Sequence, residues 1–165
     1  YKRQIHMVDL LRLFAGEFTV VHSFISNDFW RHDVEDNAYA LMKTSSNVIA
    51  SIHSTATQWR HQFRLEITLH KGLIILTGIL SGSKSYGDEE LIIVRKGDAD
   101  RDVMSEKRKK FVEDTSWQEE VYEFATAIQE DRPIVQGASA EALKTMELVY
   151  RIYRADTRWA KLYAL

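Results

Sequence analysis

The sequence predicts an α+β fold, in which a largely antiparallel, open β-sheet carries helices on one face. Three observations predict it: one helical pattern at the start of the chain, then five or six short strand patterns separated by turns, then two helical patterns. No helical pattern separates successive strand patterns, so hairpin connections are expected in place of the crossovers of a doubly wound parallel sheet.

The first helix is predicted over residues 5–16. Apolar side chains recur there at the spacing of one buried helical face, at Met7, Leu10, Leu11 and Phe14. Gly16 supplies a stop for the helix. His6 lies in the first turn and Asp9 lies one turn later, so these two side chains are close enough to interact at the start of the helix.

The strand patterns combine alternation with β-branched and aromatic residues, over residues 17–26, 37–44, 48–57, 63–70, 73–77 and 91–94. In the first, one face is expected to hold Phe18, Val20 and Phe24, and the other face Val21 and Ile25. In the third, polar residues share a face, at Ser51, His53, Thr55 and Thr57. The charged stretch 95–114 is interpreted as an exposed strand or a mobile loop.

Two helices are predicted to close the chain. The run from Ser116 to Glu119 has the pattern of a capping box, with an apolar stripe behind it at Trp117, Val121, Phe124 and Ile128. Pro133 ends that helix because proline cannot continue the hydrogen-bond ladder. Ser139 is a candidate cap for the last helix.

Length and composition favour one domain over residues 1–165, since 165 residues with 45% hydrophobic content form one substantial core. A formal net charge of −2 disfavours nucleic acid as a partner. The chain has no cysteine and no apolar run long enough for a membrane span, and we expect a soluble, cytoplasmic protein. Because the sequence starts without methionine beside a helix, we interpret it as a piece of a longer protein.

Four stretches carry a resemblance to a known family: Ile5–Gly16, Val34–Ala38, Leu80–Gly87, and Ser116–Val121 together with Pro133. They resemble the C-terminal domain of the glucose-fructose oxidoreductase / inositol dehydrogenase / MocA (Gfo/Idh/MocA) family. The resemblance implies a dihydrodipicolinate-reductase-like C-terminal fold. It also implies a parent enzyme whose N-terminal Rossmann domain binds NAD or NADP, and in which the C-terminal domain completes a sugar or polyol pocket and forms homo-oligomers through its open sheet.

The chain corresponds to the second of those domains alone. Its seven glycines form no G-x-G-x-x-G turn, so no cofactor-binding residue is expected in this chain, and the Rossmann domain and its lysine are expected upstream. One position departs from the family: an aspartate usually stands four residues before the histidine, where this sequence has Lys2. Either the pocket is atypical or residues 1–4 are not native to the active site, and we favour the second explanation.

His6 is the candidate catalytic residue, since the resemblance places a substrate-facing histidine there and imidazole titrates near neutral pH. A structural role for a single helical histidine is the alternative. Asp9 is a candidate substrate-binding residue, although fixing the helix or an arginine is the role that its position favours. The segment between two strands at Trp59, Arg60 and His61 offers a stacking surface and hydrogen-bond donors to a hydroxylated ligand. The alternative is that these residues form an ordinary connection between the strands.

Other motifs point to no further site. The spacing of His22, His32, His53 and His70 matches no metal motif, so no metal is predicted. Residues 81–86 lack the ending of a phosphate-binding loop and are interpreted as a flexible turn.

The predicted function is the substrate-binding and oligomerisation domain of an NAD(P)-dependent sugar or polyol dehydrogenase, inactive when isolated. The alternative is a non-catalytic ligand-binding or assembly module with the same fold.

Overall fold

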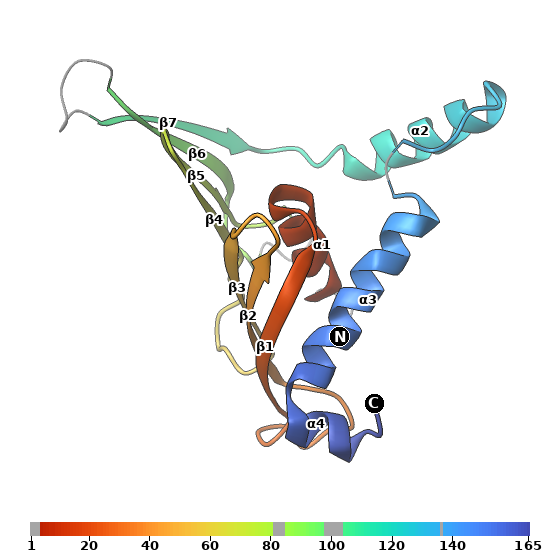
Figure 1. Ribbon diagram of the computed structural model, residues 1–165. Helices are drawn as coiled ribbons and strands as arrows, with labels where there is room; N and C mark the ends of the chain where they lie inside the picture. Colours follow the sequence, from red (N-terminus) through yellow and green to blue (C-terminus); the bar gives the residue numbers. More distant parts are fainter. Residues whose placement is uncertain (1–3, 81–84, 98–103, 136) are drawn as a thin grey trace. The chain divides into compact units, whose positions relative to one another are not determined.

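The computed structural model of the chain describes residues 4–80, 85–97, 104–135 and 137–165. The chain divides into two compact units: the first unit holds Tyr1–Gln58 and Pro133–Leu165, and the second unit holds Trp59–Arg132. Within the described residues both sheets are antiparallel, and four helices accompany them (Figure 1). The α+β prediction is therefore confirmed.

The first unit is a three-stranded sheet with helices on one side. Its strands are β1 (Phe18–Ser26), β2 (Asn37–Thr44) and β3 (Ile49–Thr55), in that order across the sheet. Its helices are α1 (Gln4–Ala15), α3 (Ser139–Ala155) and the short α4 (Thr157–Leu162). Figure 1 shows α1 and α3 on the same side of these strands, so helices and sheet form two layers.

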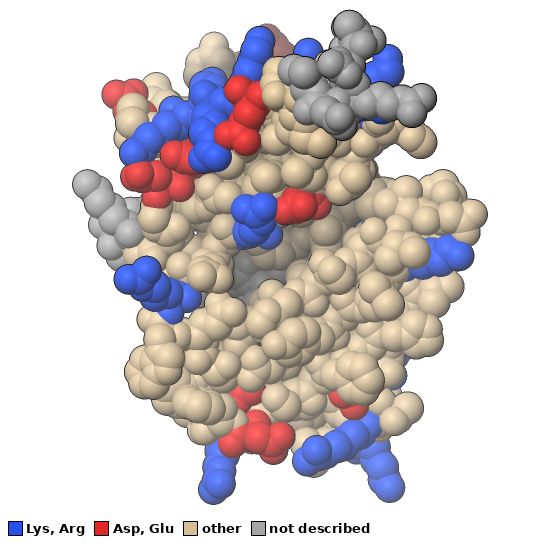
Figure 2. Space-filling model, turned by 90° about the vertical axis from the view of Figure 1, so that its left-hand side faces the viewer, with Lys and Arg blue, Asp and Glu red and all other residues tan. Residues whose placement is uncertain are grey.

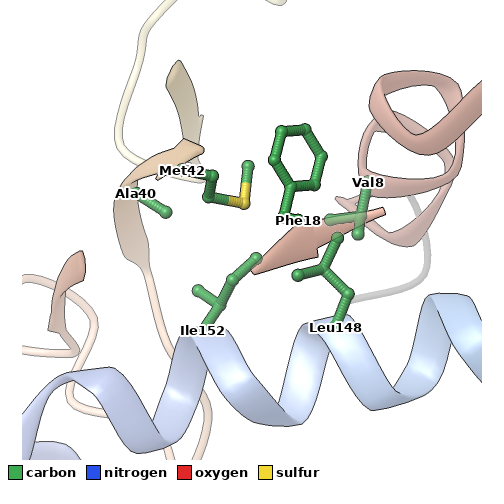
Figure 3. Close-up of a cluster of buried hydrophobic side chains, with 6 residues drawn as sticks. All are labelled: Val8, Phe18, Ala40, Met42, Leu148 and Ile152. Carbon is green, nitrogen blue, oxygen red and sulfur yellow. The ribbon is translucent and has the colours of Figure 1, made fainter. Parts of the chain in front are cut away.

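The core of the first unit lies between those layers. Figure 3 shows six buried side chains from α1, the sheet and α3 pointing toward one another, namely Val8, Phe18, Ala40, Met42, Leu148 and Ile152. On α1 the buried positions are Val8 and Arg12, whereas Phe14 is 50% exposed. The predicted buried face was therefore wrong by part of a turn, because Val8, Leu11 and Ala15 form a second apolar stripe with helical spacing.

The prediction for the faces of β1 needs a correction as well. The pairing of β1 with β2 shifts between Phe18 and Val20, which is a β-bulge. A bulge reverses the alternation of side chains beyond it. Phe18 thus faces the core, and so do Val21 and Ile25, whereas Val20 and Phe24 lie on the outer face of the sheet.

The free edge of β1 is covered by polar groups from α3 and α4. Arg151 donates to the backbone oxygens of Phe18 (2.6 Å) and Thr19 (3.0 Å), at the bulge. Asp156 accepts a 2.7 Å bond from the backbone nitrogen of Ile25 and also caps α4. These bonds satisfy backbone groups that an edge strand would otherwise leave to solvent or to another chain.

The second unit is a four-stranded meander followed by a helix. Strands β4 (Arg64–Leu69), β5 (Gly72–Thr77), β6 (Glu89–Lys96) and β7 (Met104–Phe111) pair in chain order, and α2 spans Ser116–Gln129. β7 occupies part of the charged stretch 95–114, whose residues 98–103 lie outside the described part. Its side chains are exposed from Met104 to Lys110.

Two predicted helix caps differ in the structure. Ser116 is the first residue of α2, the N-cap is Thr115, and the Ser116 hydroxyl donates to Asp114 at 2.6 Å in place of a capping bond. Ser139 is likewise the first residue of α3, whose N-cap is Ala138. In α2 the predicted apolar stripe is exposed, with Trp117 at 76%.

Candidate functional site

A pocket of about 730 Å³ lies within the first unit. Its walls come from the start of α1, the segment before β2, strands β2 and β3, and helices α3 and α4. The polar side chains that line it are those of His6, Asp33, Glu35, Ser54, Tyr150, Tyr153 and Tyr163. Most of the remaining lining is aliphatic or aromatic, which is the usual composition of a small-molecule site.

Asp36 holds the segment that carries two of these polar residues. This buried carboxylate accepts backbone bonds from Phe29 (2.8 Å) and Trp30 (3.1 Å) and side-chain bonds from Ser26 and Asn37. Burial alone would raise the pKa of Asp36, but these hydrogen bonds together hold it below its ordinary value. The segment leading to Glu35 is thus fixed from both sides.

Glu35 and Tyr153 form a pair at the pocket. Glu35 is 5% exposed. The pKa of Tyr153 is raised by burial first, then by the charge of Glu35 and by the hydrogen bond between the two side chains. The phenol therefore stays protonated and donates to the carboxylate, while its own oxygen can still accept a hydrogen bond.

Aromatic rings from α3 and α4 form one wall of the pocket. The ring centroids of Trp159 and Tyr163 are 4.4 Å apart, and those of Tyr153 and Trp159 are 6.2 Å apart. Trp159 is buried, and the hydroxyl of Tyr163 receives a 3.2 Å bond from Asn27. Such a wall gives an apolar surface on which the C–H face of a ring can lie.

The structure places His6 at this pocket, in the first turn of α1 with an exposed side chain. Asp9 does not line the pocket. It accepts a 2.6 Å bond from the hydroxyl of Thr145 and lies 3.6 Å from Arg12, whose buried guanidinium also pairs with Glu17 and Glu141. The carboxylate of Asp9 is therefore engaged with α3 and Arg12.

The three predicted residues between β3 and β4 belong to the second unit. Trp59 is 96% exposed and Arg60 is exposed. His61 lies 3.2 Å from the hydroxyl of Ser85 and meets the ring of Tyr86 edge-on, with centroids 5.0 Å apart. None of the three lines the pocket of the first unit.

Several pocket residues were missed in the sequence, and one signal could have found them. Four aromatic residues fall within the last sixteen positions, at Tyr150, Tyr153, Trp159 and Tyr163. Tyr150 and Tyr153 are three residues apart, as neighbours on one helix face are. Glu35 gives no comparable signal, because its neighbour Asp36 is acidic too and only the fold separates their roles.

The described residues offer little to a metal or a dinucleotide. In that part of the chain no three His, Asp or Glu side chains gather as a ligand set. Among the described residues that line the pocket there is neither a lysine, an arginine nor a glycine to hold a pyrophosphate, so the pocket walls do not fit a nicotinamide dinucleotide. None of the described helices is long and apolar enough to span a bilayer.

Comparison with known proteins gives a sequence match and a set of structural relatives. Residues 2–75 match the family described as the GFO/IDH/MocA C-terminal domain. No curated protein matches the chain.

Three solved structures share its fold at low sequence identity. UDP-N-acetylglucosamine 3-dehydrogenase GnnA from Acidithiobacillus ferrooxidans has a TM-score of 0.75 at 17% identity, over 94% of this chain and 47% of that one. The aldose-aldose oxidoreductase from Caulobacter crescentus, complexed with glycerol, has a TM-score of 0.72 at 18% identity, over 93% of this chain and 44% of that one. The WlbA dehydrogenase from Bordetella pertussis, in complex with NADH and UDP-GlcNAcA, has a TM-score of 0.66 at 18% identity, over 94% of this chain and 41% of that one.

The chain spans less than half the length of each of these proteins. All three relatives are oxidoreductases by name, and the sequence match covers α1, the first sheet and most of the first hairpin of the second unit. The resemblance predicted from the sequence is thus confirmed. Residues 2–75 match the C-terminal domain family of the Gfo/Idh/MocA oxidoreductases, and the described chain has the fold of those domains.

Proposed function

We propose that the chain is the substrate-binding and oligomerisation part of an NAD(P)-dependent oxidoreductase that acts on a carbinol carbon of a sugar or polyol. The observation that carries this proposal is the position of His6. It lies on the helix that begins the family match, and it lines a pocket whose other walls are aromatic and acidic. Hydrogen-bond acceptors beside aromatic rings suit a hydroxylated ring.

His6 is the proposed proton carrier. As the carbinol is oxidised, its hydroxyl proton passes to the imidazole of His6, and it returns in the reverse direction. A domain outside this chain would hold the nicotinamide cofactor, which when bound would supply the acceptor or donor of the hydride. The hydroxyl of Ser54 and the Glu35–Tyr153 pair are placed to orient the remaining hydroxyls of the substrate.

The other predicted contacts have different support. Asp9 is engaged by Thr145 and Arg12, which favours a role in holding α1, and its contact with substrate stays a prediction. Trp59, Arg60 and His61 remain proposed substrate contacts from the second unit. Trp59 is 96% exposed, so its indole is available to stack on a ligand.

The test is turnover in the full-length parent protein. Reduction of NAD or NADP is followed with a panel of sugars and polyols, for the wild type and for His6→Asn. We expect the variant to lose about 10²–10⁴-fold in turnover, the scale of a lost general acid or base, with an unchanged melting temperature. His6→Gln, which also removes the imidazole, should lose a similar factor.

A structural histidine would give the opposite result, namely a lower melting temperature and unchanged activity per folded molecule. No turnover with any panel member would favour the non-catalytic module. The 165-residue chain by itself is proposed to be inactive and to leave NAD(H) and NADP(H) unbound in a calorimetric titration. A micromolar dissociation constant for either nucleotide would contradict that part of the proposal.

A further inference from the structure

The segment between β1 and β2 presents two neighbouring aromatic side chains to solvent. Phe29 is 58% exposed and Trp30 is 50% exposed, and their rings meet edge to face with centroids 4.8 Å apart. The rest of the segment over residues 28–34 is exposed as well. Aromatic side chains of this size usually lie in a core or at an interface, so a pair left in solvent points to a binding role.

Hydrogen bonds hold this exposed pair in place. The buried carboxylate of Asp36 accepts from the backbone nitrogens of Phe29 (2.8 Å) and Trp30 (3.1 Å). The indole N–H of Trp30 donates to the backbone oxygen of Ala56 at 3.0 Å. Arg31 has a φ of +57°, which is uncommon for a residue with a Cβ and persists only where the surroundings fix the backbone. The indole is therefore preorganised, which lowers the entropy cost of binding a ligand.

The same segment continues into the wall of the pocket in the first unit. Asp33 lines the pocket, and its Cα atom is at most about 11 Å from that of Trp30, because only three peptide units separate them. The amide of Asn27 donates to the backbone oxygen of His32 (2.8 Å) and to the hydroxyl of Tyr163 (3.2 Å). Tyr163 also lines the pocket, directly after α4 (Figure 1). The aromatic pair thus lies beside the pocket without lining it.

This arrangement suits a ligand of two linked rings. An uncharged indole face packs against the C–H face of a sugar ring. The indole N–H is already bonded to Ala56, so the contact would depend on the ring face. We propose that Phe29 and Trp30 form a second subsite, which holds the neighbouring sugar ring of a glycoside whose first ring enters the pocket. The inference rests on the proposed function and deepens it, because it names glycosides as the substrate class.

Matched sugars test the subsite in the 165-residue chain. Galactose is compared with lactose, and glucose with cellobiose, so that each pair shares its non-reducing ring. Binding is followed by NMR through two indole N–H signals, that of Trp159 for the pocket and that of Trp30 for the subsite. We expect each disaccharide to shift both signals and to bind about tenfold more tightly than its monosaccharide. Disaccharides that bind no more tightly than the monosaccharides would overturn the inference.

The decisive variant is Trp30→Ala, which removes the stacking surface outside the pocket lining. We expect it to lower the affinity for the disaccharide to that for the monosaccharide, as followed through Trp159. Trp117→Ala is the matched control, because Trp117 is also an exposed tryptophan, at 76%, but lies on α2 in the second unit. An equal loss in the two variants, or no loss in Trp30→Ala, would overturn the role of Trp30.

Trp30→Ala also removes the bond to Ala56, so a second variant guards against a folding defect. Phe29→Ala leaves that bond and both backbone bonds to Asp36 in place, and we expect a smaller loss of the same preference for the disaccharide. A preference that stays complete in this variant would remove Phe29 from the subsite and refute the proposed pair.

The proposed function is tested by a different measurement, the reduction of NAD(P) by the parent protein. A parent that oxidises monosaccharides as readily as their glycosides would keep the proposed function and refute the subsite. A chain that binds neither class of sugar would also overturn the inference.

Discussion

Arg12 shows how a single charged residue can be part of a core. Its side chain is buried, and it donates to Glu17, to Glu141 and to the hydroxyl of Thr145. The hydrogen bond from Arg12 is the main cause that lowers the pKa of Glu17. The carboxylates of Glu17 and Glu141 both reach solvent, whereas the guanidinium of Arg12 is buried. The guanidinium therefore depends on these partners to compensate its charge.

Thr145 is the buried link of this network, and its replacement gives a prediction. Its hydroxyl accepts from Arg12 at 2.6 Å and donates to Asp9 at 2.6 Å. Thr145→Val keeps the shape but removes both bonds, and it should lower the free energy of unfolding by about 1–3 kcal/mol in chemical denaturation. Thr19→Val, at an exposed threonine of β1, is the control. Equal losses in the two variants would contradict the network's role.

Asp36 makes the stability depend on pH. Its pKa in the folded chain lies below its ordinary value of 3.8. A depressed pKa means that the unfolded chain takes up the proton first, so the stabilisation is complete above the unfolded pKa and is lost as the pH falls through the folded pKa. We expect the free energy of unfolding to fall between about pH 5 and pH 2.

Asp36→Asn isolates this contribution. Near neutral pH the variant should be less stable than the wild type, because the substitution removes the carboxylate. Its free energy of unfolding should also fall less on acidification than that of the wild type, as measured by denaturation at a series of pH values. Asp28→Asn, at an exposed position of the same segment, serves as the control. An acid dependence in Asp36→Asn as steep as that of the wild type would contradict the assignment.

The sequence predicts residue positions better than residue environments. The place of His6 in the first turn of α1 follows from the helical spacing that ends at Gly16. The burial of Arg12 does not, since the partners Glu141 and Thr145 lie on α3, far along the chain. Pairs of this kind depend on tertiary packing, which the spacing within one helix cannot reveal.

At the scale of elements, hairpins were predictable and irregularities were not. The strands alternate clearly enough for the meander of the second unit to be read from residues 63–77 and 91–94. The bulge in β1 has no sequence signal, yet it exchanges the faces expected for Val20 and Val21. The caps of α2 and α3 were misplaced by one residue, the usual error at helix ends.

Two glycines of the second unit, which have similar backbone angles but different surroundings, give a prediction about alanine substitution. Gly78 and Gly87 both have positive φ, at +71° and +77°. A Cβ at Gly78 would collide with the backbone oxygen of Asp88, whereas a Cβ at Gly87 would meet nothing within 4 Å. Gly87→Ala should therefore cost only the backbone strain, about 1–2 kcal/mol, and Gly78→Ala clearly more.

Thermal unfolding of the two variants measures the difference. We expect Gly78→Ala to have the lower melting temperature, because the colliding atom belongs to the backbone and cannot rotate away. Equal melting temperatures would mean that the close approach of the segments around Gly78 and Asp88 does not hold in solution.

At the scale of the whole molecule, the outer face of the first sheet is not covered by the described helices of its own unit. The register places apolar side chains from all three strands on this face, and they are exposed: Val20 (44%), Phe24 (79%), Tyr39 (48%), Leu41 (54%) and Ile49 (67%). Figure 2, which looks at the left-hand side of Figure 1, shows a surface made mostly of uncharged residues. Exposed apolar patches of this kind mark interaction surfaces.

Homo-oligomerisation through this face is the last prediction, and the β-bulge in β1 decides which residues of that strand the surface carries. Val21 and Ile25 face the core, so the outer face joins Ser51, His53 and Thr55 to Val20 and Phe24 instead. His53 already stacks on Tyr39, with centroids 4.0 Å apart, which leaves a flat aromatic surface. A second copy can cover such a face by two-fold symmetry, because each copy then presents the same patch to the other.

Sedimentation velocity at tens of micromolar should therefore detect a dimer or a larger assembly, and Phe24→Lys should shift it toward monomer by burying a charge within the apolar face. Val112→Lys is the matched control, because Val112 is equally exposed at 79% but lies between β7 and α2, in the second unit. A wild-type chain that sediments as a monomer would refute the prediction. Equal dissociation in both variants would instead move the interface away from the first sheet.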